Sequence, residues 1–488
     1  MSTEAKPGWL PRSTPARVVL YGALALSAVL KARIVFTDEG INWPDELYQS
    51  FEPAHRLVYG YALMPWEFLD GARTWFVPSF VAGWMFLCKL LGADSPATYV
   101  HVVKLVFVAV SLAAALGTYR LARGFAAREL EAAVASATWS LCALGLYFSH
   151  RAMSENLAAA FVVWGVALVL SDGATRRERL IGASLLGLAT LARLQSALVC
   201  VVVAALAFFP RGRRDLRGGL EVLGTLAVWA LVLGLWDAAA WHSVPSAKFG
   251  GLFHSAVVYY RFNIIENGAV AWGTSSWDYF FHYLYTTMPG VSVALGVSAL
   301  LSVRRAWRLV LLLAAFLLLH ALMPHKELRF MVPILPFAAA FIGIALSAWP
   351  EQPARLGLAA VAATVLISAW NHKQLTMGDV GSYLTRPQSS AWDDFGFVNR
   401  LLLAANRESD LCGIRIDAVH PAWTGGITYL HRRAPIYSPG FPPQRGHFNY
   451  AIVPAGSGAQ VIATDTGWDL VKLGPTCVPD PGYTWKLP

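Results

Sequence analysis

The sequence predicts an α-helical protein that crosses a membrane several times and ends in a small α/β domain. Of its 488 residues, 56% are hydrophobic and only 14% are charged, whereas soluble domains carry about 25% charged residues. Repeated apolar runs are long enough to cross the ~30 Å hydrocarbon core of a bilayer. After residue 370 the composition becomes turn-rich, with many Pro and Gly residues. We therefore expect a membrane domain over residues 1–370 and a soluble domain on the outer side over residues 371–488.

About eleven segments are expected to cross the membrane. The first covers residues 18–36, and because Lys6, Arg12 and Arg17 precede it, the N-terminus should lie inside. No suitable A-x-A cleavage motif is present, so we expect a retained span and not a removed signal. The other expected spans are 98–119, 131–149, 154–171, 179–193, 195–209, 219–241, 285–303, 308–323, 329–348 and 355–370.

Residues 75–92 are also long enough to cross, but the charge pattern argues against a crossing. Arginine-rich loops are expected on the inside; they cover residues 120–128, 172–179, 210–217 and 304–308. An odd number of crossings must then separate residue 37 from residue 120, and the span 98–119 supplies one. We therefore expect residues 75–92 to be re-entrant or interfacial.

This arrangement gathers the residues with chemical potential on the outer face. Ionisable residues next to membrane spans usually have a functional reason to be there. The polar segments expected outside are 37–74, 149–155, 193–195, 242–284 and 323–330, whereas the inside has only basic loops. The charge rule alone therefore predicts an external active site.

The first external loop, residues 37–74, contains an acidic pair at the start of a predicted helix. Pro44 suits a helix start, and apolar residues at three- and four-residue spacing predict an amphipathic helix over 45–58 that lies on the membrane. The carboxylates of Asp45 and Glu46 suit a general base that takes a proton from a sugar hydroxyl. The alternative is a simple helix cap, which favours acids by ~0.3–1 kcal/mol.

Aromatic and polar side chains around this pair suit a sugar, which has one apolar face and a rim of hydroxyls. The candidates for contact with the acceptor or the sugar are Trp43, Gln49, Glu52, His55, Tyr59, Trp66 and Glu67. The aromatic residues could equally form a belt at the membrane interface.

A second polar cluster covers residues 325–330, in a short loop between two apolar runs. His325, Lys326 and Arg329 could hold a phosphate and stabilise it as a leaving group. The alternative is a solvated turn in which Glu327 pairs with a neighbouring cation. Three further charges, Arg151, Glu155 and Arg193, lie at the tips of spans. Snorkelling explains them well, and contact of Arg193 with the donor phosphate is the functional alternative.

Several classes of site are excluded or left open. Cysteine and histidine spacings typical of zinc sites are missing, and so are glycine-rich motifs that bind nucleotides. We therefore expect neither a zinc site nor a nucleotide donor held in a Rossmann domain. The net charge of +9 reflects basic loops and does not indicate nucleic acid. Cys412 and Cys477 could form a disulfide outside the cytosol or remain free thiols.

Two motifs resemble those of the GPI mannosyltransferases and the wider glycosyltransferase family 22. The first runs from Trp43-Pro44-Asp45-Glu46 through Gln49, Glu52, His55 and Tyr59-Gly60-Tyr61 to Trp66-Glu67-Phe68. Arg73-Thr74-Trp75-Phe76-Val77-Pro78 continues this pattern. The second is His325-Lys326-Glu327-Leu328-Arg329-Phe330, followed by Pro333 and Pro336. Residues 151–155 match a family segment only loosely, and Met64-Pro65 departs from the usual Leu-Thr, so acceptor contacts are expected to differ there.

The resemblance implies the GT-C membrane fold, a polyprenyl-phosphate sugar as donor, and an inverting transfer that needs no metal. It implies that Asp45 is the base, with Glu46 next, and that His325, Lys326 and Arg329 contact the donor phosphate. The composition is typical of a GC-rich genome, which favours a bacterial inner-membrane protein with a periplasmic site. A eukaryotic member would face the lumen of the endoplasmic reticulum. The acceptor would be a glycolipid or polysaccharide.

Two rival functions remain open on the sequence. One is a GT-C transferase for another polyprenyl-phosphate sugar, such as arabinose or glucose. The other is a transporter or flippase for a lipid-linked sugar, which would need ionisable residues at mid-membrane depth and often shows internal repeats.

Overall fold

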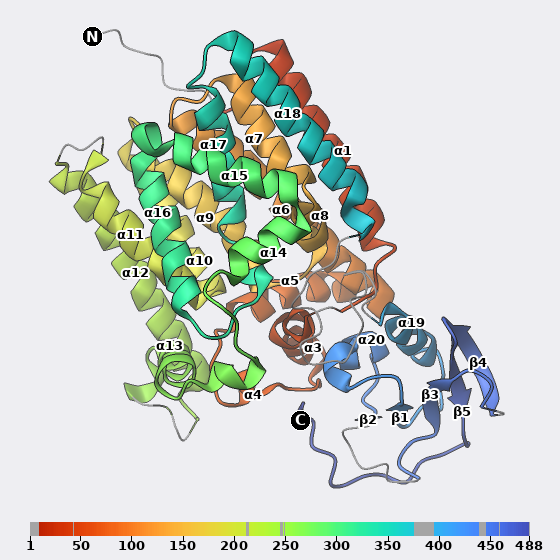
Figure 1. Ribbon diagram of the computed structural model, residues 1–488. Coiled ribbons are helices and arrows are strands. Elements are labelled where there is room, and N and C mark those ends of the chain that lie inside the picture. The colour runs from red at the N-terminus through yellow and green to blue at the C-terminus, as the bar shows by residue number, and fades with distance from the viewer. Residues whose placement is uncertain are drawn as a thin grey trace.

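The computed structural model describes residues 9–41, 43–210, 214–244, 247, 249–374, 395–438, 446–457 and 459–487. These residues form a long helical bundle, with a smaller α/β domain at one end of it (Figure 1). Part of the predicted basic loop 210–217 lies outside the described residues.

Each predicted span corresponds to a helix or a pair of helices. Among the described residues, five helices are long and apolar enough to cross a membrane, and a sixth span is counted if one bent pair is included. The five are α1 (Thr14–Val35), α6 (Pro96–Gly124), α12 (Leu216–Trp241), α16 (Val303–Leu322) and α18 (Glu351–Trp370). The bent pair is α7 (Glu129–Leu141) followed by α8 (Ala143–Tyr147) and a short turn, with an angle of 59° between them. The chain is thus an integral membrane protein.

The remaining predicted spans are shorter helices. They are α9 (Ser154–Leu170), α10 (Arg176–Ala192), α11 (Ala197–Ala207), α14 (Tyr279–Thr287) with α15 (Pro289–Leu301), and α17 (Leu335–Leu346). A capping box between Thr175 and Glu178 fixes the start of α10. The predicted span 329–348 begins later than expected, because Arg329 lies in a 3₁₀ turn, Leu328–Met331, that precedes α17. The count of eleven crossings stays a prediction.

Residues 75–92 contain α5 (Phe76–Leu90), which packs against α6 and against the helix of the first loop. The expectation that this segment does not cross stays a prediction.

The predicted helix of the first loop is confirmed, and it runs through residues 44–59. It consists of α2 (Pro44–Glu46), a π-helical stretch over residues 47–51 and α3 (Glu52–Tyr59), and it ends at Gly60, whose φ is +87°. Figure 1 shows α3 end-on, while α1 and α18 run along the bundle, so this helix lies across the bundle direction. We call residues 44–59 the loop helix. Residues 46–55 are all buried within the protein, whereas Arg56 and Leu57 are exposed, and the expectation that this helix lies on the membrane stays a prediction.

The C-terminal domain contains α19 (Gly396–Ala405), α20 (Gly426–Leu430) and a five-stranded sheet of order β2-β1-β3-β5-β4. The sequence of this domain predicts strands at 413–419, 435–437 and 449–453, and they are present as β1 (Ile414–Ile416), β2 (Ile436–Tyr437) and β3 (Tyr450–Pro454). They pair in parallel, with β1 in the middle. Two further strands, β4 (Gln460–Asp465) and β5 (Trp468–Lys472), were not predicted from the sequence and form an antiparallel hairpin beside β3.

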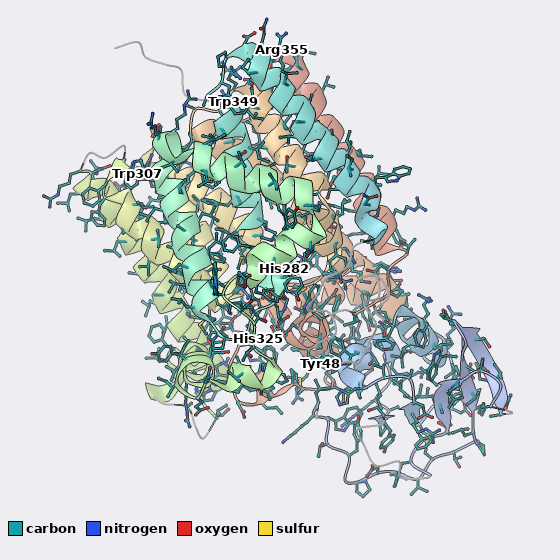
Figure 2. All side chains as sticks on the ribbon, viewed as in Figure 1. Tyr48, His282, Trp307, His325, Trp349 and Arg355 are labelled. Atoms are coloured by element: carbon teal, nitrogen blue, oxygen red, sulfur yellow. A yellow bond between two sulfur atoms is a disulfide. The ribbon has the colours of Figure 1, made fainter. Side chains whose placement is uncertain are left out.

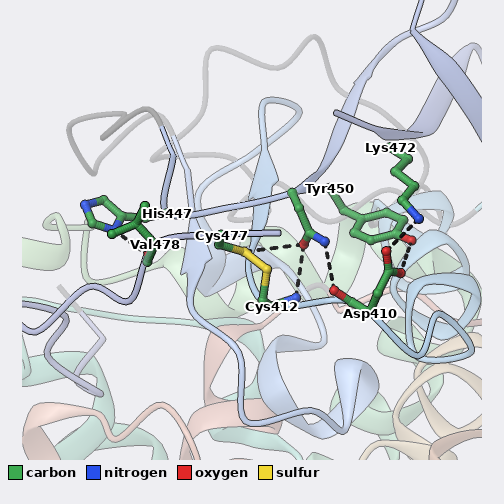
Figure 3. The surroundings of a disulfide bond; sticks show 8 residues. Asp410, Cys412, His447, Tyr450, Lys472, Cys477 and Val478 are labelled. Carbon is green, nitrogen blue, oxygen red and sulfur yellow. Dashed lines mark hydrogen bonds and ion pairs between the residues drawn. A yellow bond between two sulfur atoms is a disulfide. The ribbon is translucent and has the colours of Figure 1, made fainter. Parts of the chain in front are cut away.

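Cys412 and Cys477 form a disulfide, which settles an alternative that the sequence left open (Figure 3). The side chain of Asn449 holds this region together, since its oxygen accepts from the Cys412 N–H at 3.0 Å and its amide donates to the Asp410 carbonyl at 2.8 Å. Asp410 in turn pairs with Lys472 of β5 at 2.6 Å. The disulfide therefore links the chain just before β1 to the segment that follows β5.

The C-terminal domain and the loop helix share one hydrophobic core. Leu47 and Phe51 of the loop helix belong to the same buried cluster as Val398 of α19 and Ile427 of α20. The Tyr48 hydroxyl also donates to the Pro421 carbonyl at 2.8 Å. The domain is thus packed directly onto the loop that carries the acidic pair.

Candidate active site

Four polar segments that are distant in the sequence meet at the end of the bundle that carries the C-terminal domain. Asp45 comes from the start of the loop helix, Glu155 from the first turn of α9, Arg193 from the end of α10, and Arg329 from the turn before α17. Figure 2 shows Tyr48 and His325 near this end, whereas Trp307, Trp349 and Arg355 lie at the opposite end. The expected convergence of the loops on one face is therefore present.

Arg329 connects the two sequence motifs. Its guanidinium contacts Asp45 at 2.5 Å, Glu155 at 2.9 Å and Glu327 at 2.6 Å. The side chain is only 4% exposed. Although burial lowers its pKa, the three carboxylates raise the pKa of Arg329 well above its ordinary value. Arg329 is thus a permanent cation held in a fixed position against Asp45.

Glu155 extends the network to a second arginine. One of its oxygens accepts from Arg193 at 2.7 Å and from Arg329 at 2.9 Å, and the other accepts from the Ser154 hydroxyl at 2.9 Å. The guanidinium of Arg193 lies 5.1 Å from the centre of the Phe330 ring. The snorkelling interpretation is wrong for Glu155, Arg193 and Arg151, because all three are buried and paired within the protein. An acidic residue at the tip of an apolar span was the available signal for Glu155.

Glu46 faces away from Asp45 and has its own partners. Its carboxylate accepts from Arg151 at 2.9 Å and from the Ala152 N–H at 3.3 Å, and it is fully buried. Arg151 also contacts Asp38 at 3.3 Å. Neighbouring residues on a helix point about 100° apart, which separates the two acids. The geometry supports a structural role for Glu46, not the predicted role in catalysis.

The pKa of Asp45 is set by burial and by the charged groups around it. Burial, together with the carboxylates of Glu327 and Glu155, raises the pKa of Asp45, while Arg329 and Arg73 oppose the rise. Burial also raises the pKa of Glu67, which accepts a hydrogen bond from Gln49 at 3.2 Å. A raised pKa makes a carboxylate a stronger base near neutral pH.

A pocket lies beside this network. The polar part of its wall comes from Gln49, Arg73, Thr74, Ser154 and Arg193, and the apolar part from Phe68, Val77, Leu191, Ala192 and Leu194. The buried Nε of Arg73 has no hydrogen-bond partner among the described residues. The same guanidinium lies 5.5 Å from the centre of the Tyr259 ring. The pocket is thus lined by the guanidinium groups of Arg73 and Arg193, and the Nε–H of Arg73 has no acceptor among the described residues. In the sequence, Arg73 stands out only as part of a motif.

His325 and Lys326 bind the loop 242–284 instead of facing this pocket. His325 contacts Glu327 at 2.9 Å and the Gly273 carbonyl at 3.1 Å. Burial lowers the pKa of His325, but these contacts outweigh it and raise the pKa overall. The ammonium of Lys326 donates to the Ser275 and Met323 carbonyls at 3.0 and 2.5 Å. A direct contact of either residue with the donor phosphate would require these bonds to break.

The predicted sugar-binding residues fall into two groups. Gln49 lines the pocket, and Glu67 is bonded to Gln49. The Trp66 ring instead packs 4.5 Å from that of Phe262. The geometry does not support sugar contacts for the others, which are Trp43, Glu52, His55 and Tyr59. Trp43 packs against Phe148 with ring centres 5.1 Å apart.

The other three of these residues face the C-terminal domain. The imidazoles of His55 and His431 are 2.9 Å apart, and the Tyr59 ring lies 4.6 Å from the His431 ring. The Glu52 carboxylate accepts a hydrogen bond from the Thr428 N–H. Burial raises the pKa of Glu52 to about 7. These residues hold two parts of the protein together, and Glu52 and His55 are buried in that contact.

Among the residues that the structure describes, no group of three or more His, Cys, Asp or Glu side chains could hold a metal ion. The expected independence from metals stays a prediction.

The family model described as the Alg9-like mannosyltransferase family matches residues 24–384. The chain belongs to this family. Its membership confirms the resemblance to glycosyltransferase family 22. The match includes both motifs and all the residues that surround Asp45 and Arg329 in this site.

Two relatives show how far the similarity extends. Mannosyltransferase APTG1 of Arabidopsis thaliana is 26% identical over 311 residues, which are 62% of this chain and 54% of the relative. GPI mannosyltransferase 3 of Yarrowia lipolytica is 26% identical over 352 residues, which are 69% of this chain and 64% of the relative. The chain thus spans between about half and two thirds of the length of these relatives.

The solved structure of ArnT from Cupriavidus metallidurans has the same fold. It superposes on 95% of this chain and 99% of its own with a TM-score of 0.61 at 13% identity. The structure of ArnT bound to undecaprenyl phosphate superposes with a TM-score of 0.57 at 12% identity. The expected GT-C fold is therefore confirmed.

Proposed function

We propose that the protein is an inverting mannosyltransferase that uses a polyprenyl-phosphate-linked donor and a hydroxyl of a glycolipid or polysaccharide as acceptor. The observation that carries this proposal is the contact of Asp45 with Arg329, at 2.5 Å. It brings the two family motifs together beside a pocket that presents two further arginines. Membership in the mannosyltransferase family supports the choice of sugar.

The pocket suits the phosphate of the donor. Guanidinium groups bind phosphate through paired hydrogen bonds, and Arg73 and Arg193 both line the pocket, together with the hydroxyl of Ser154. A protein of the same fold, ArnT, has been solved with undecaprenyl phosphate bound. We therefore assign the donor phosphate to Arg73 and Arg193, in place of the predicted contacts with His325 and Lys326. Arg329 keeps Asp45 in place.

The reaction then needs one base and one stabilised leaving group. Asp45 takes the proton of the acceptor hydroxyl while the hydroxyl oxygen attacks the anomeric carbon from the face opposite the phosphate. The new bond joins that oxygen to the anomeric carbon, and the bond from this carbon to the phosphate oxygen breaks. The electron pair leaves with the polyprenyl phosphate, whose charge Arg73 and Arg193 stabilise. The anomeric configuration inverts, and no step uses a metal.

The site is proposed to face away from the cytosol. Basic loops mark the inner side of a membrane protein, and Trp307, within the basic loop 304–308, lies at the end of the bundle opposite His325 (Figure 2). The C-terminal domain carries a disulfide, which forms in oxidising compartments. Both observations favour the periplasmic side of a bacterial inner membrane, or the lumen of the endoplasmic reticulum in a eukaryote.

The test is transfer from synthetic short-chain polyprenyl-phosphate mannose to a panel of glycolipid acceptors, with purified protein, detergent and EDTA. The wild-type protein should give a product of inverted configuration. Asp45→Asn should lower turnover by about 10²–10⁴-fold, the usual contribution of a general base. Glu351→Gln is the matched control, because Glu351 is an exposed carboxylate in the first turn of α18, with 79% of its side chain exposed. It should leave turnover unchanged.

Three results would change the assignment. Near-normal turnover by the Asp45→Asn variant would remove Asp45 as the base. Product formed from polyprenyl-phosphate arabinose or glucose, and none from mannose, would keep the mechanism and replace the sugar. No product from any such donor would overturn the proposal and favour a protein that binds or moves lipid-linked sugars.

A further inference from the structure

Glu52 connects the loop helix to two other parts of the chain. Its side chain is fully buried, and both carboxylate oxygens accept hydrogen bonds. One oxygen accepts from the Leu63 N–H at 2.6 Å. The other accepts from the Thr428 N–H at 2.7 Å and from the Thr428 hydroxyl at 2.9 Å. One carboxylate thus bonds to the segment after the loop helix and to α20 of the C-terminal domain.

The contact with α20 is closely packed. Gly426 has a φ of +53°, and a Cβ atom at this position would lie 2.7 Å from the Glu52 carboxylate oxygen and 3.2 Å from a methyl group of Leu47. A side chain at this position would push the Glu52 carboxylate aside, and the backbone conformation also favours glycine. The C-terminal domain is therefore in close contact with the Glu52 carboxylate.

The segment after the loop helix is held at a second point. The Met64 N–H donates to the Trp485 carbonyl at 3.0 Å, and the Leu487 N–H donates to the Met64 carbonyl at 3.0 Å. Two residues after Met64 the chain reaches Trp66 and then Glu67, which bonds to Gln49 of the loop helix. Glu52 therefore links the loop helix, which carries Asp45, to the segment after it, which carries Glu67.

We propose that Glu52 is a positioning residue for the transfer reaction, which fixes Asp45 and Glu67 relative to each other by bonding the loop helix to Leu63 and to the C-terminal domain. It does not touch the substrate. The inference rests on the proposed role of Asp45 as the base. It makes the C-terminal domain part of the catalytic apparatus, although its residues lie outside the pocket.

The test compares Glu52→Gln with variants of its partner in the full-length protein. A glutamine has one oxygen and a donating NH₂ group, so it cannot accept from both sides. Turnover should fall by about 10–100-fold, the effect of a shift of about 1 Å in a reacting group, while KM for short-chain polyprenyl-phosphate mannose stays within about twofold. Thr428→Val should give a smaller loss, and Thr428→Ser should restore the wild-type rate.

Two further measurements separate positioning from general destabilisation. Asp469→Asn is the matched control, because Asp469 is also a buried carboxylate of the C-terminal domain and accepts from the Gly456 N–H and the Thr464 hydroxyl. It should lower the melting temperature without lowering kcat. Amide hydrogen exchange of Glu52→Gln should rise in residues 44–51 and 426–431, and the double variant with Thr428→Val should be no slower than Glu52→Gln alone.

Turnover of Glu52→Gln within twofold of the wild type, an equal loss of kcat in Asp469→Asn, or additive effects in the double variant would each overturn the inference. Asp45→Asn is assayed in parallel. If that variant retains turnover, the proposed base is wrong, whereas the exchange data still report whether Glu52 orders the loop helix.

Discussion

Replacing Arg329 with lysine should disturb the base without removing the positive charge. Arg329 contacts three carboxylates at 2.5–2.9 Å through separate nitrogens, whereas lysine offers one nitrogen and cannot reach all three. Breaking a buried ion pair costs about 3–5 kcal/mol. If about 1.4 kcal/mol of this loss destabilises the ionised form of Asp45 relative to the protonated form, the pKa of Asp45 rises by about one unit. Arg329 is the main group that lowers this pKa, and Glu327 and Glu155 raise it, so the direction is upward.

The assay is kcat/KM between pH 5.5 and 9, measured with short-chain polyprenyl-phosphate mannose. Activity rises with pH as Asp45 loses its proton, so a higher pKa moves the rising limb to more alkaline pH by about one unit. Arg355→Lys is the matched control, since Arg355 is exposed at the opposite end of the bundle (Figure 2). An Arg329→Lys variant with the wild-type pH profile and rate would refute the reasoning that this ion pair sets the basicity of Asp45.

Two other substitutions test the roles assigned to neighbouring groups. Glu46→Gln leaves the buried cation of Arg151 with a weaker partner, so it should destabilise the protein by about 3–5 kcal/mol. It should slow turnover far less than Asp45→Asn does. Equal losses of turnover in the two variants would restore Glu46 as a candidate base. Cys412→Ser opens a bridge between residues separated by 65 positions, which should cost about 4 kcal/mol on the chain-entropy estimate. Thermal unfolding in detergent measures it, and an unchanged melting temperature would contradict the expectation.

The sequence predicted the parts of the site that local pattern encodes. The acidic pair, the helix that carries it and the cluster around Arg329 could all be found from spacing and motif. The division of roles between Asp45 and Glu46 could not, because it depends on Arg151, which is 105 positions from Glu46. Charges at the ends of spans look alike in a sequence, whether they meet lipid head groups or each other. The prediction that Glu155 and Arg193 snorkel toward the head groups therefore fails.

The sugar-binding candidates failed for a related reason. Glu52 and His55 stand among aromatic residues in the sequence, a pattern that is typical of carbohydrate sites. Their partners, Thr428 and His431, each lie 376 positions further along the chain. No local pattern distinguishes a side chain that faces a sugar from one that faces a distant domain.

The shared core of the loop helix and the C-terminal domain also orders the events of biosynthesis. A ribosome adds about 5–20 residues per second, so the 376 positions between Glu52 and Thr428 take roughly 20–75 s to synthesise. During that time Leu47 and Phe51 have been made, but the α20 residues that cover them have not. The nascent chain must keep this apolar surface from aggregating until α20 emerges, near the end of the chain. A protein truncated before α20 would expose the same surface permanently and become a target for quality control.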